Sequence, residues 1–572
     1  MSLLVLAALC AAVLLGGYVL YGPMLSRLLG LDPHAKTPAV ELRDDADYVP
    51  ISPRFLIGQH FSAIAAAGPI VGPILAGLMF GWVPALLWIV LGSIFIGGVH
   101  DMAALVASVR HRARSIAEVV KEHMTQRAYL LFLGFVWLAL VYVIVAFTDI
   151  TASSFVGVQE LESGERVSGG GIATSSLLYL ALPVVMGVLL RYAGLSLRWA
   201  TIIFLPLVGV AIWAGQHIPL DLAALLGLSG NQAVKVWDVL LLAYCFVASV
   251  APMWILLQPR GHLGGYFLFA SLAAALLGVV FGGNVAQFPA FRGWTAPGGD
   301  ALFPILFITI ACGACSGFHA IVASGTTSKQ LRYETDAKPI GYGAMLLEGM
   351  VAVVSLLCLM MLAPGDAALK SPKPNFIYAL GIGKFLGVVG IDPVLGISFG
   401  LMAFTTFVYD TLDVCTRLGR YIVQELLGWQ SRGGRWFATA LTAAVPLAFV
   451  MRTTLDAKGA VIPAWKVFWG LFGASNQLLA ALTLIGVTVW LWRTGRARWG
   501  CLITGLPAVW MYVMSVWALV LAIAGSFGAK GVTADPVPWV ALVLIGLAGL
   551  MLVEAVRVFI RPLSRPPAPA TA

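Results

Sequence analysis

Long apolar stretches recur along the whole sequence, and they limit the possible folds more than any other feature. Of 572 residues, 60% are hydrophobic and only 11% are charged, whereas a soluble chain has about a quarter of its residues charged. A packed soluble core of this size would lack the charged surface that keeps it in water. The sequence therefore predicts an all-α, polytopic membrane protein, and it excludes a soluble multidomain enzyme, a nucleic-acid-binding protein and a disordered chain. We expect about fifteen spans: 2–22, 57–80, 84–109, 129–156, 175–190, 199–216, 237–257, 265–283, 301–327, 341–363, 392–416, 437–451, 465–492, 500–526 and 537–560.

The basic residues collect in alternate loops. If the N-terminus lies outside, the loops on the cytoplasmic side hold 25 of the 35 Lys and Arg residues, as the positive-inside rule requires. The first 22 residues lack the basic start and the cleavage site of a signal peptide, so we expect a retained helix. The C-terminal tail then lies in the cytoplasm. The largest loops, 23–55 and 364–391, are too short for an independent core.

Two Gly-Pro pairs interrupt the second apolar segment, 57–77. Each proline removes a backbone donor and frees carbonyl groups that lipid cannot satisfy. Unwound backbone at membrane depth lines substrate and ion sites in transporters. The alternative is a plain proline kink, but the polar neighbours favour a binding site. The predicted substrate-binding residues here are Gln59, His60, Ser62, Gly68, Pro69 and Gly72.

A second segment rich in glycine and hydroxyl side chains lies at 312–330. Its first half aligns with the other broken segment: FHAIVASGT matches FSAIAAAGP at five of nine positions. The topology runs the two in opposite directions, as in an inverted repeat. The alternative is that the hydroxyls bond back to their own helix. The predicted substrate-binding residues here are Ser316, His319, Ser324, Gly325, Thr326 and Thr327.

Ionisable residues inside spans are costly, so each is a functional hypothesis. Asp413 and Arg417 lie four residues apart, which favours a structural ion pair. Glu348 also lies within a span, and Asn476-Gln477 is expected to hold helices together. The seven cysteines lie almost entirely in apolar segments and predict neither disulfides nor redox chemistry. The residues that we expect to carry a coupling proton are His60, His100, Asp101, Asp149 and Asp410.

Six motifs resemble the carbon starvation protein CstA family, and they follow the family's order from Gly58 to about Leu482. The chain departs from the family at Gly261-His262, where members carry an acidic residue and an aromatic one, and it is shorter than the longest members at its C-terminal end. The motifs are GQHFSAIAAAGPIVGPILAG, GGVHDMAALVASVRHRARSIAEV, PMWILLQPR, SGFHAIVASGTTSKQ, TLDVCTRLGRYIVQE and LFGASNQLLAAL.

The resemblance implies a secondary transporter of the bacterial inner membrane that imports peptides or pyruvate during carbon starvation. It also implies the inverted-repeat fold of the amino acid–polyamine–organocation superfamily, with a broken first helix in each repeat. Five spans should then separate the broken helices, whereas the predicted pair is seven apart. The segment 245–258, interrupted at Pro252, lies five spans from the first broken helix and is the alternative candidate for the second one. We expect one transporter domain: 1–56 as an added helix and loop, 57–492 as the core, and 493–572 as the final helices and tail.

Together these features predict a cation-coupled importer of small carboxylates or peptides. The histidines favour protons over sodium as the coupling ion. Helix N-termini and hydroxyls near Gly68 and Ser324 would bind the substrate carboxylate. No cofactor, resident metal or nucleic-acid partner is predicted, and a homo-oligomer stays open. The alternatives are an intramembrane protease with an Asp101–Asp410 dyad and a nutrient sensor; the chain lacks H-E-x-x-H, G-x-S-x-G and Walker motifs.

Overall fold

Helices make up most of the described residues and strands very few, which confirms the all-α prediction. The computed structural model describes residues 1–44, 48–161, 164–252, 254–455, 458–495, 498–530 and 535–560. Within these ranges the only sheets are two antiparallel hairpins. The predicted cytoplasmic tail, 561–572, lies outside the described residues. The hairpin strands are β1 (Val158–Glu160) with β2 (Arg166–Ser168), and β3 (Thr454–Leu455) with β4 (Val461–Ile462).

Among the described residues, twelve helices are long and apolar enough to cross a membrane, and one bent pair makes up to thirteen. The bent pair is α4 (Pro53–Ile64) with α5 (Gly68–Phe80), which meet at 49°. The twelve are Leu3–Leu28 (α1, Leu3–Gly16, and α2, Gly22–Leu28), Trp82–Arg110 (α6, Trp82–Gly92, and α7, Gly98–Arg110), α9 (Gln126–Ser154), α10 (Gly169–Tyr192), α11 (Leu197–His217), α13 (Gly230–Val250), α14 (Leu257–Phe281), Glu334–Met360 (with α18, Ala344–Met360), α21 (Pro393–Leu427), α23 (Ala464–Thr494), Gly500–Gly528 within α24 (Arg498–Lys530), and α25 (Pro536–Ile560).

Two of the fifteen expected spans are helical but do not form a long apolar helix. The region 301–327 is divided into α15 (Leu302–Thr309), α16 (Ala311–Ala314) and α17 (Gly317–Gly325). The other is α22 (Arg432–Val450), which begins with two arginines in its first turn. The loop expected at 364–391 holds two further helices, α19 (Ala367–Lys370) and α20 (Pro374–Gly387).

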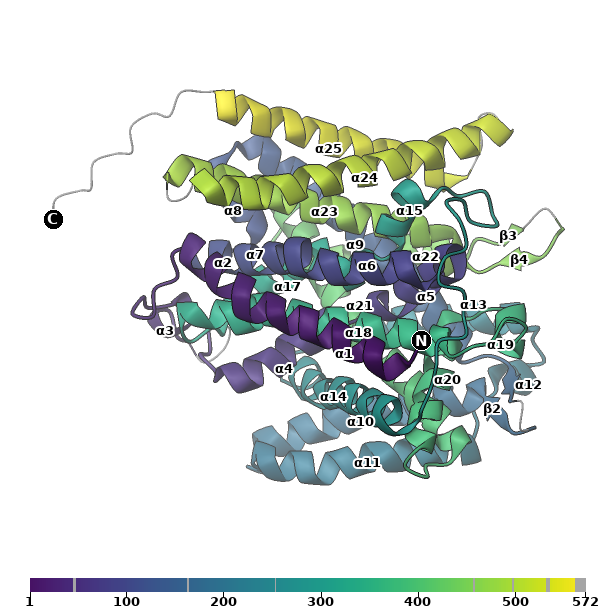
Figure 1. Ribbon diagram of the computed structural model, residues 1–572. Helices are drawn as coiled ribbons and strands as arrows, with labels where there is room; N and C mark the ends of the chain where they lie inside the picture. Colours follow the sequence, from purple (N-terminus) through teal and green to yellow (C-terminus); the bar gives the residue numbers. More distant parts are fainter. Residues whose placement is uncertain are drawn as a thin grey trace.

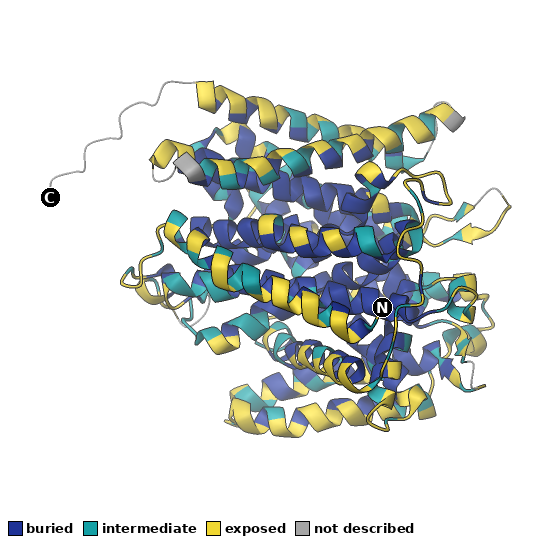
Figure 2. Cartoon of the chain, in the orientation of Figure 1, coloured by how far each residue is buried: buried dark blue, intermediate teal, exposed yellow. Residues whose placement is uncertain are grey.

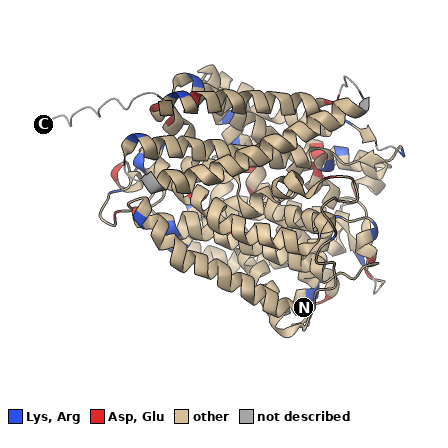
Figure 3. Cartoon of the chain, turned by 45° about the horizontal axis from the view of Figure 1, so that its top comes forward, with Lys and Arg blue, Asp and Glu red and all other residues tan. Residues whose placement is uncertain are grey.

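The connections divide between two ends of the helix bundle. The N-terminus, the β3–β4 hairpin, α19 and α12 (Leu222–Leu226) lie at one end in Figure 1, while α3 (Pro38–Glu41) and α8 (Ile116–His123) lie at the other. Charged residues lie mostly at the two ends, and uncharged residues make up most of the helix bodies (Figure 3). We call the end with α3 and α8 the basic end. It is formed by the segments 23–44, 48–55, 110–128, 191–198, 328–340 and 417–436.

Burial separates central helices from a peripheral layer (Figure 2). In α23, 94% of the most apolar window is buried, against 28% in α11 and 33% in α24. Exposed apolar side chains on α11, α24 and α25 fit a lipid environment, because a soluble surface would bury or replace them. The central helices therefore hold the polar groups that need explanation.

The two broken regions pack directly against each other. A Cβ added to Gly68 would lie 2.4 Å from the Cys312 side chain, and one added to Gly72 would lie 2.5 Å from the Thr309 carbonyl. Glycine is needed at both positions because any larger side chain would push the two backbones apart. The Gly-Pro pairs therefore create a close helix contact.

The two breaks fall at different places in the aligned motifs. In the first motif the break lies at residues 65–67, after Phe61, whereas in the second it lies at residues 315–316, before Phe318. The start of α4 and the end of α17 lie at the same end of the bundle, since Ile51 pairs with Leu331. The two segments therefore run in opposite directions, as expected, but their breaks are not equivalent by sequence position.

The competing break at 245–258 is a connection between α13 and α14 at the basic end. There Arg417 donates to the carbonyls of Ala248 and Ala251. The second broken helix is therefore the α15–α17 region.

Candidate functional site

Three histidines and two carboxylates from four helices form a fully buried group. We call His60, His100, Asp101, His319 and Glu348 the histidine cluster. His100 Nδ1 lies 2.7 Å from one Asp101 oxygen, and His319 Nδ1 lies 2.8 Å from the other. His319 is 218 residues from Asp101 in sequence. The fold therefore brings together three of the five predicted proton carriers, with His319 bridging them to Glu348.

His319 stands between two carboxylates. Its Nδ1 faces Asp101, and its Nε2 lies 3.1 Å from a Glu348 oxygen, at ion-pair distance but without hydrogen-bond geometry. Both ring nitrogens donate only in the imidazolium form. A charge on His319 offsets carboxylate charges that would be costly to bury alone. The cluster has no Lys or Arg, so its positive charge depends on bound protons.

His60 extends the group toward the basic end. Its Nδ1 lies 2.8 Å from the Thr327 hydroxyl, which joins the first broken helix to the segment after α17. Among the described residues, His60 Nε2 and His100 Nε2 have no hydrogen-bond partner. Within the described part of the chain, His319 Nε2 and both oxygens of Glu348 lack a hydrogen-bond partner as well. A buried polar atom without a partner costs free energy, so the cluster keeps unused hydrogen-bonding positions on its histidines and on Glu348.

A second buried group is built around Arg260. We call Arg260, Asp410, Asp413, Tyr244 and Ser62 the arginine cluster. Arg260 Nε donates to Asp410 at 2.6 Å, and another guanidinium nitrogen contacts both Asp413 and the Tyr244 hydroxyl. Ser62 donates to the second Asp410 oxygen at 2.8 Å. The guanidinium is always charged, so this cluster keeps its cation at any physiological pH.

The arginine cluster corrects two sequence predictions. The segment 258–264 was expected to be a cytoplasmic loop, but it belongs to α14, and Arg260 is 1% exposed. The predicted Asp413–Arg417 pair is wrong, since Asp413 pairs with Arg260 and Arg417 donates to carbonyls of α13 and the residue after it.

Asp149 belongs to a third group, near the end opposite the basic end. One Asp149 carboxylate oxygen accepts a hydrogen bond from the backbone amide of Trp465 at 2.8 Å. The ammonium nitrogen of Lys235, on α13, lies 3.9 Å from a carboxylate oxygen of Asp149 and 3.9 Å from one of Asp238. Its basic partner comes from another helix, which sequence spacing could not reveal. Asp149 and Asp410 therefore lie in different groups from His100 and Asp101.

A cavity of about 1420 Å³ opens at the basic end. Its lining includes Gly58 and Gln59 of α4, and the end of α17 with Thr326. Pro259 and Gly261 also line it, next to the buried Arg260. Basic side chains outnumber acidic ones in the lining: Arg54, Arg114, Arg191, Lys329 and Arg417 against Glu118 and Glu425. The lining favours a negatively charged solute.

The predicted substrate-binding residues divide into two sets. The hydroxyls of Ser324 and Thr326 donate hydrogen bonds to the carbonyls of Ala320 and Val322, which is the alternative of bonding back to their own helix. Both residues also line the cavity. The residues that line the cavity are Gln59, Ser324, Gly325 and Thr326. The residues behind its wall are His60, Ser62, Gly68, Pro69, Gly72, Ser316, His319 and Thr327.

The N-terminus of α17 is occupied by a side chain. Asn476 of α23 accepts from the Phe318 amide at 3.0 Å, bonds to Ser316 and donates to Cys312. This agrees with the expected role of Asn476 in holding helices together. In the described residues all seven cysteines are free, with six buried, as predicted.

Sequence reasoning missed Arg260 and Tyr244 as functional candidates. Pro259 and Gly261 made the segment resemble a loop. The available signal was Asp410 and Asp413, which lie three apart on one helix face and require a buried cation.

Comparisons with known proteins agree with these features. The family model described as Carbon starvation protein CstA matches residues 1–376 and 366–518. The peptide transporter CstA of Helicobacter pylori is 31% identical over 571 residues, covering 89% of this chain and 80% of the relative. The pyruvate/proton symporter BtsT of Escherichia coli is 30% identical over 585 residues, covering 88% and 78%.

A manganese transporter of Eremococcus coleocola has a similar solved structure, with a TM-score of 0.45 and 15% identity, covering 91% of this chain and 98% of that one. The family model and the identities, which extend over most of the sequence, establish that this chain belongs to the carbon starvation protein CstA family.

Proposed function

We propose that this chain is a proton-coupled importer of small carboxylates, with pyruvate or short peptides as substrates. One observation carries the proposal: a large cavity with a basic lining ends beside a buried histidine cluster that has no fixed cation. The named activities of the CstA and BtsT relatives support the same class. A transporter explains why costly charges are kept inside the bundle.

Substrate and proton would occupy adjacent places. The wall residues Gln59 and Thr326 each precede a residue of the His60–Thr327 hydrogen bond. A carboxylate bound at the wall would favour a proton on His60, because opposite charges stabilise each other in a low-dielectric site. Binding of one would thereby promote binding of the other, which is the requirement for symport.

The orientation follows from the basic lining. We place the basic end in the cytoplasm, with the N-terminus outside, by the positive-inside rule. The cavity is then open to the cytoplasm, in the state that releases an imported substrate. The single transporter unit would have 57–492 as its core, in the inner membrane of a bacterium.

Reconstituted protein tests the proposal. Labelled pyruvate and a labelled dipeptide are offered to proteoliposomes with and without an inwardly directed pH gradient. Accumulation above equilibrium that requires the gradient supports proton coupling, and dependence on a sodium gradient alone contradicts it. No accumulation of either compound contradicts the importer.

The other functional classes find less support. Asp410 is bonded to Arg260 and Ser62, and Asp101 to two histidines, so no shared hydrogen bond joins them as in a protease dyad. The relatives are named transporters rather than enzymes or sensors.

A further inference from the structure

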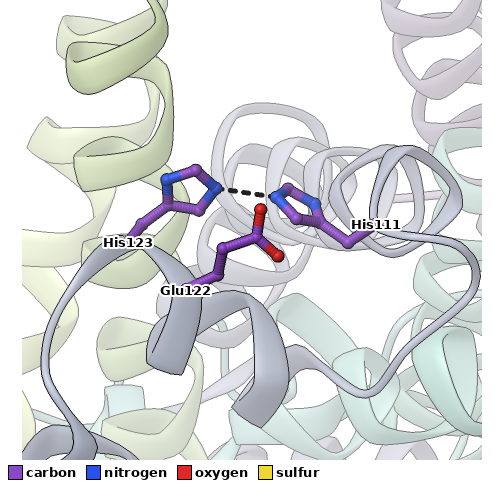
Figure 4. Close-up of side chains that lie close together, drawn as sticks. All are labelled: His111, Glu122 and His123. Carbon is purple, nitrogen blue, oxygen red and sulfur yellow. Dashed lines mark hydrogen bonds between the residues drawn. The ribbon is translucent and has the colours of Figure 1, made fainter. Parts of the chain in front are cut away.

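A cluster outside the transport site lies at the basic end, beside the cavity (Figure 4). His111 directly follows α7, and Glu122 and His123 end α8. The two imidazole rings point at each other, with their Nε2 atoms 2.7 Å apart. One ligand atom from each of the three residues lies within 4.8 Å of the others.

Local hydrogen bonds prepare one imidazole to bind a cation. His111 Nδ1 lies 2.6 Å from the Ala107 carbonyl. A carbonyl only accepts, so the ring proton is on Nδ1, and Nε2 of the neutral ring presents its lone pair toward His123. A second partner that fixes the outer ring nitrogen is the usual arrangement around a metal-binding histidine.

The surrounding chain holds both rings in place. Arg112 and Ala113 have positive φ angles of 61° and 54°, a conformation that non-glycine residues seldom adopt, and the turn they form leads from His111 into α8. The His111 ring lies edge-on to Trp490 of α23, with centroids 5.6 Å apart. At the other ring, Arg493 donates to the His123 carbonyl at 3.0 Å.

We propose that His111, His123 and Glu122 form a site for a divalent transition-metal ion of the Zn²⁺ class. Two imidazole nitrogens and one carboxylate oxygen suit Zn²⁺, Co²⁺ or Ni²⁺ better than Ca²⁺ or Mg²⁺. Ligand atoms of a tetrahedral zinc ion lie about 3.4 Å apart, so small rotations of the side chains admit the ion. Three protein ligands leave one position for water.

Binding requires no loss of a proton from the site. His111 already presents a free Nε2 lone pair, and His123 presents one when its ring proton moves from Nε2 to Nδ1 through solvent. The ion would join the C-terminal ends of α7, which carries His100 and Asp101, and α8, which lines the cavity.

Metal binding to the intact chain tests the site. Full-length protein is purified in detergent, treated with a chelator and titrated with Zn²⁺ by calorimetry, and with Co²⁺ by visible absorption. We expect about one Zn²⁺ per chain and a Co²⁺ spectrum of four-coordinate geometry. No saturable binding of either ion would overturn the proposal.

Variants locate the bound ion. His111→Ala with His123→Ala should abolish it, and Glu122→Gln should weaken affinity by at least about tenfold. His217→Ala is the matched control, because His217 Nδ1 also bonds to the carbonyl four residues earlier, at 2.8 Å, but faces no second imidazole. Equal binding by the double variant and the wild type would overturn the proposal.

A measurement on the wild-type protein tests the metal site even if the double variant does not fold. Zn²⁺ should protect His111 and His123, but not His217, from modification by diethyl pyrocarbonate, mapped by mass spectrometry. Equal modification of all three with and without Zn²⁺ would overturn the site.

Discussion

The histidine cluster and the arginine cluster are both buried behind the cavity wall, both contain two carboxylates, and both receive a residue of α4. They differ in their cation. In the arginine cluster a guanidinium holds Asp410 and Asp413 and stays charged. In the histidine cluster only imidazoles can balance Asp101 and Glu348. We infer that the first fixes helices α4, α14 and α21 together, while the second changes its charge during transport.

Removal of the fixed cation should have the largest effect. Arg260→Ala leaves two buried carboxylates without a partner, which costs about 3–5 kcal/mol, so we expect little folded protein. Thermal unfolding in detergent measures the loss. Arg198→Ala, at an exposed arginine outside the cavity lining, should unfold within about 0.5 kcal/mol of the wild type. An unchanged melting temperature for Arg260→Ala would show that the arginine cluster is not structural.

Asp101→Asn should separate coupling from folding. The amide keeps the shape of the carboxylate but removes the charge that both imidazoles contact, so gradient-driven accumulation should be lost while substrate exchange without a gradient continues. Uptake and counterflow in proteoliposomes measure the two. Asp413→Asn is the control: it should lower stability and keep the response to the gradient. If Asp413→Asn abolished the response to the gradient and Asp101→Asn only lowered stability, the arginine cluster would carry the proton and the histidine cluster would be structural.

The pH response should depend on His60. The coupling proton is itself carried with the substrate, so wild-type uptake should rise as the outer solution is made more acidic. His60→Gln keeps a hydrogen bond to Thr327 but carries no proton, and uptake should fall about tenfold, equal to about 1.4 kcal/mol, with a flatter pH profile. His217→Gln should leave the profile unchanged. A wild-type profile in the variant would assign His60 a packing role.

Ser62→Ala should have the smallest effect. It removes one hydrogen bond to Asp410 while Arg260 keeps the other oxygen paired, so stability should fall by about 1 kcal/mol and proton coupling should persist. Thermal unfolding and gradient-driven uptake are measured on the same sample. A loss of proton coupling without a loss of stability would show that the two clusters act together as one proton relay.

Local patterns predicted the spans and the broken helices well because every backbone polar group inside a lipid bilayer must form its hydrogen bond within the protein. Length and hydropathy therefore nearly suffice to predict a spanning helix such as α9 or α25. Glycine, proline and hydroxyl residues in the same stretch marked α4–α5 and α17. The prediction failed where one charge interrupted an apolar run: Arg260 was assigned to a loop, although α14 begins at Leu257.

Contacts between distant segments could not be predicted from spacing. His319 and Asp101 lie on α17 and α7, and nothing in either segment identifies the other as its partner. The same holds for Asp149 and Lys235. Sequence reasoning named most of the ionisable residues, but it could not sort them into the groups that decide their chemistry.

The glycine contact between the broken helices also limits how the protein can move. Gly68 lies against Cys312 and Gly72 against the backbone at Thr309, with no room between them. Sliding one broken helix past the other would drive the α5 backbone into the Cys312 side chain and the Thr309 carbonyl, so we expect α5, the end of α15 and α16 to travel as one rigid body. The hinges that close the cavity opening at the basic end must then lie elsewhere, among other helices that line the cavity, such as α14 and α21.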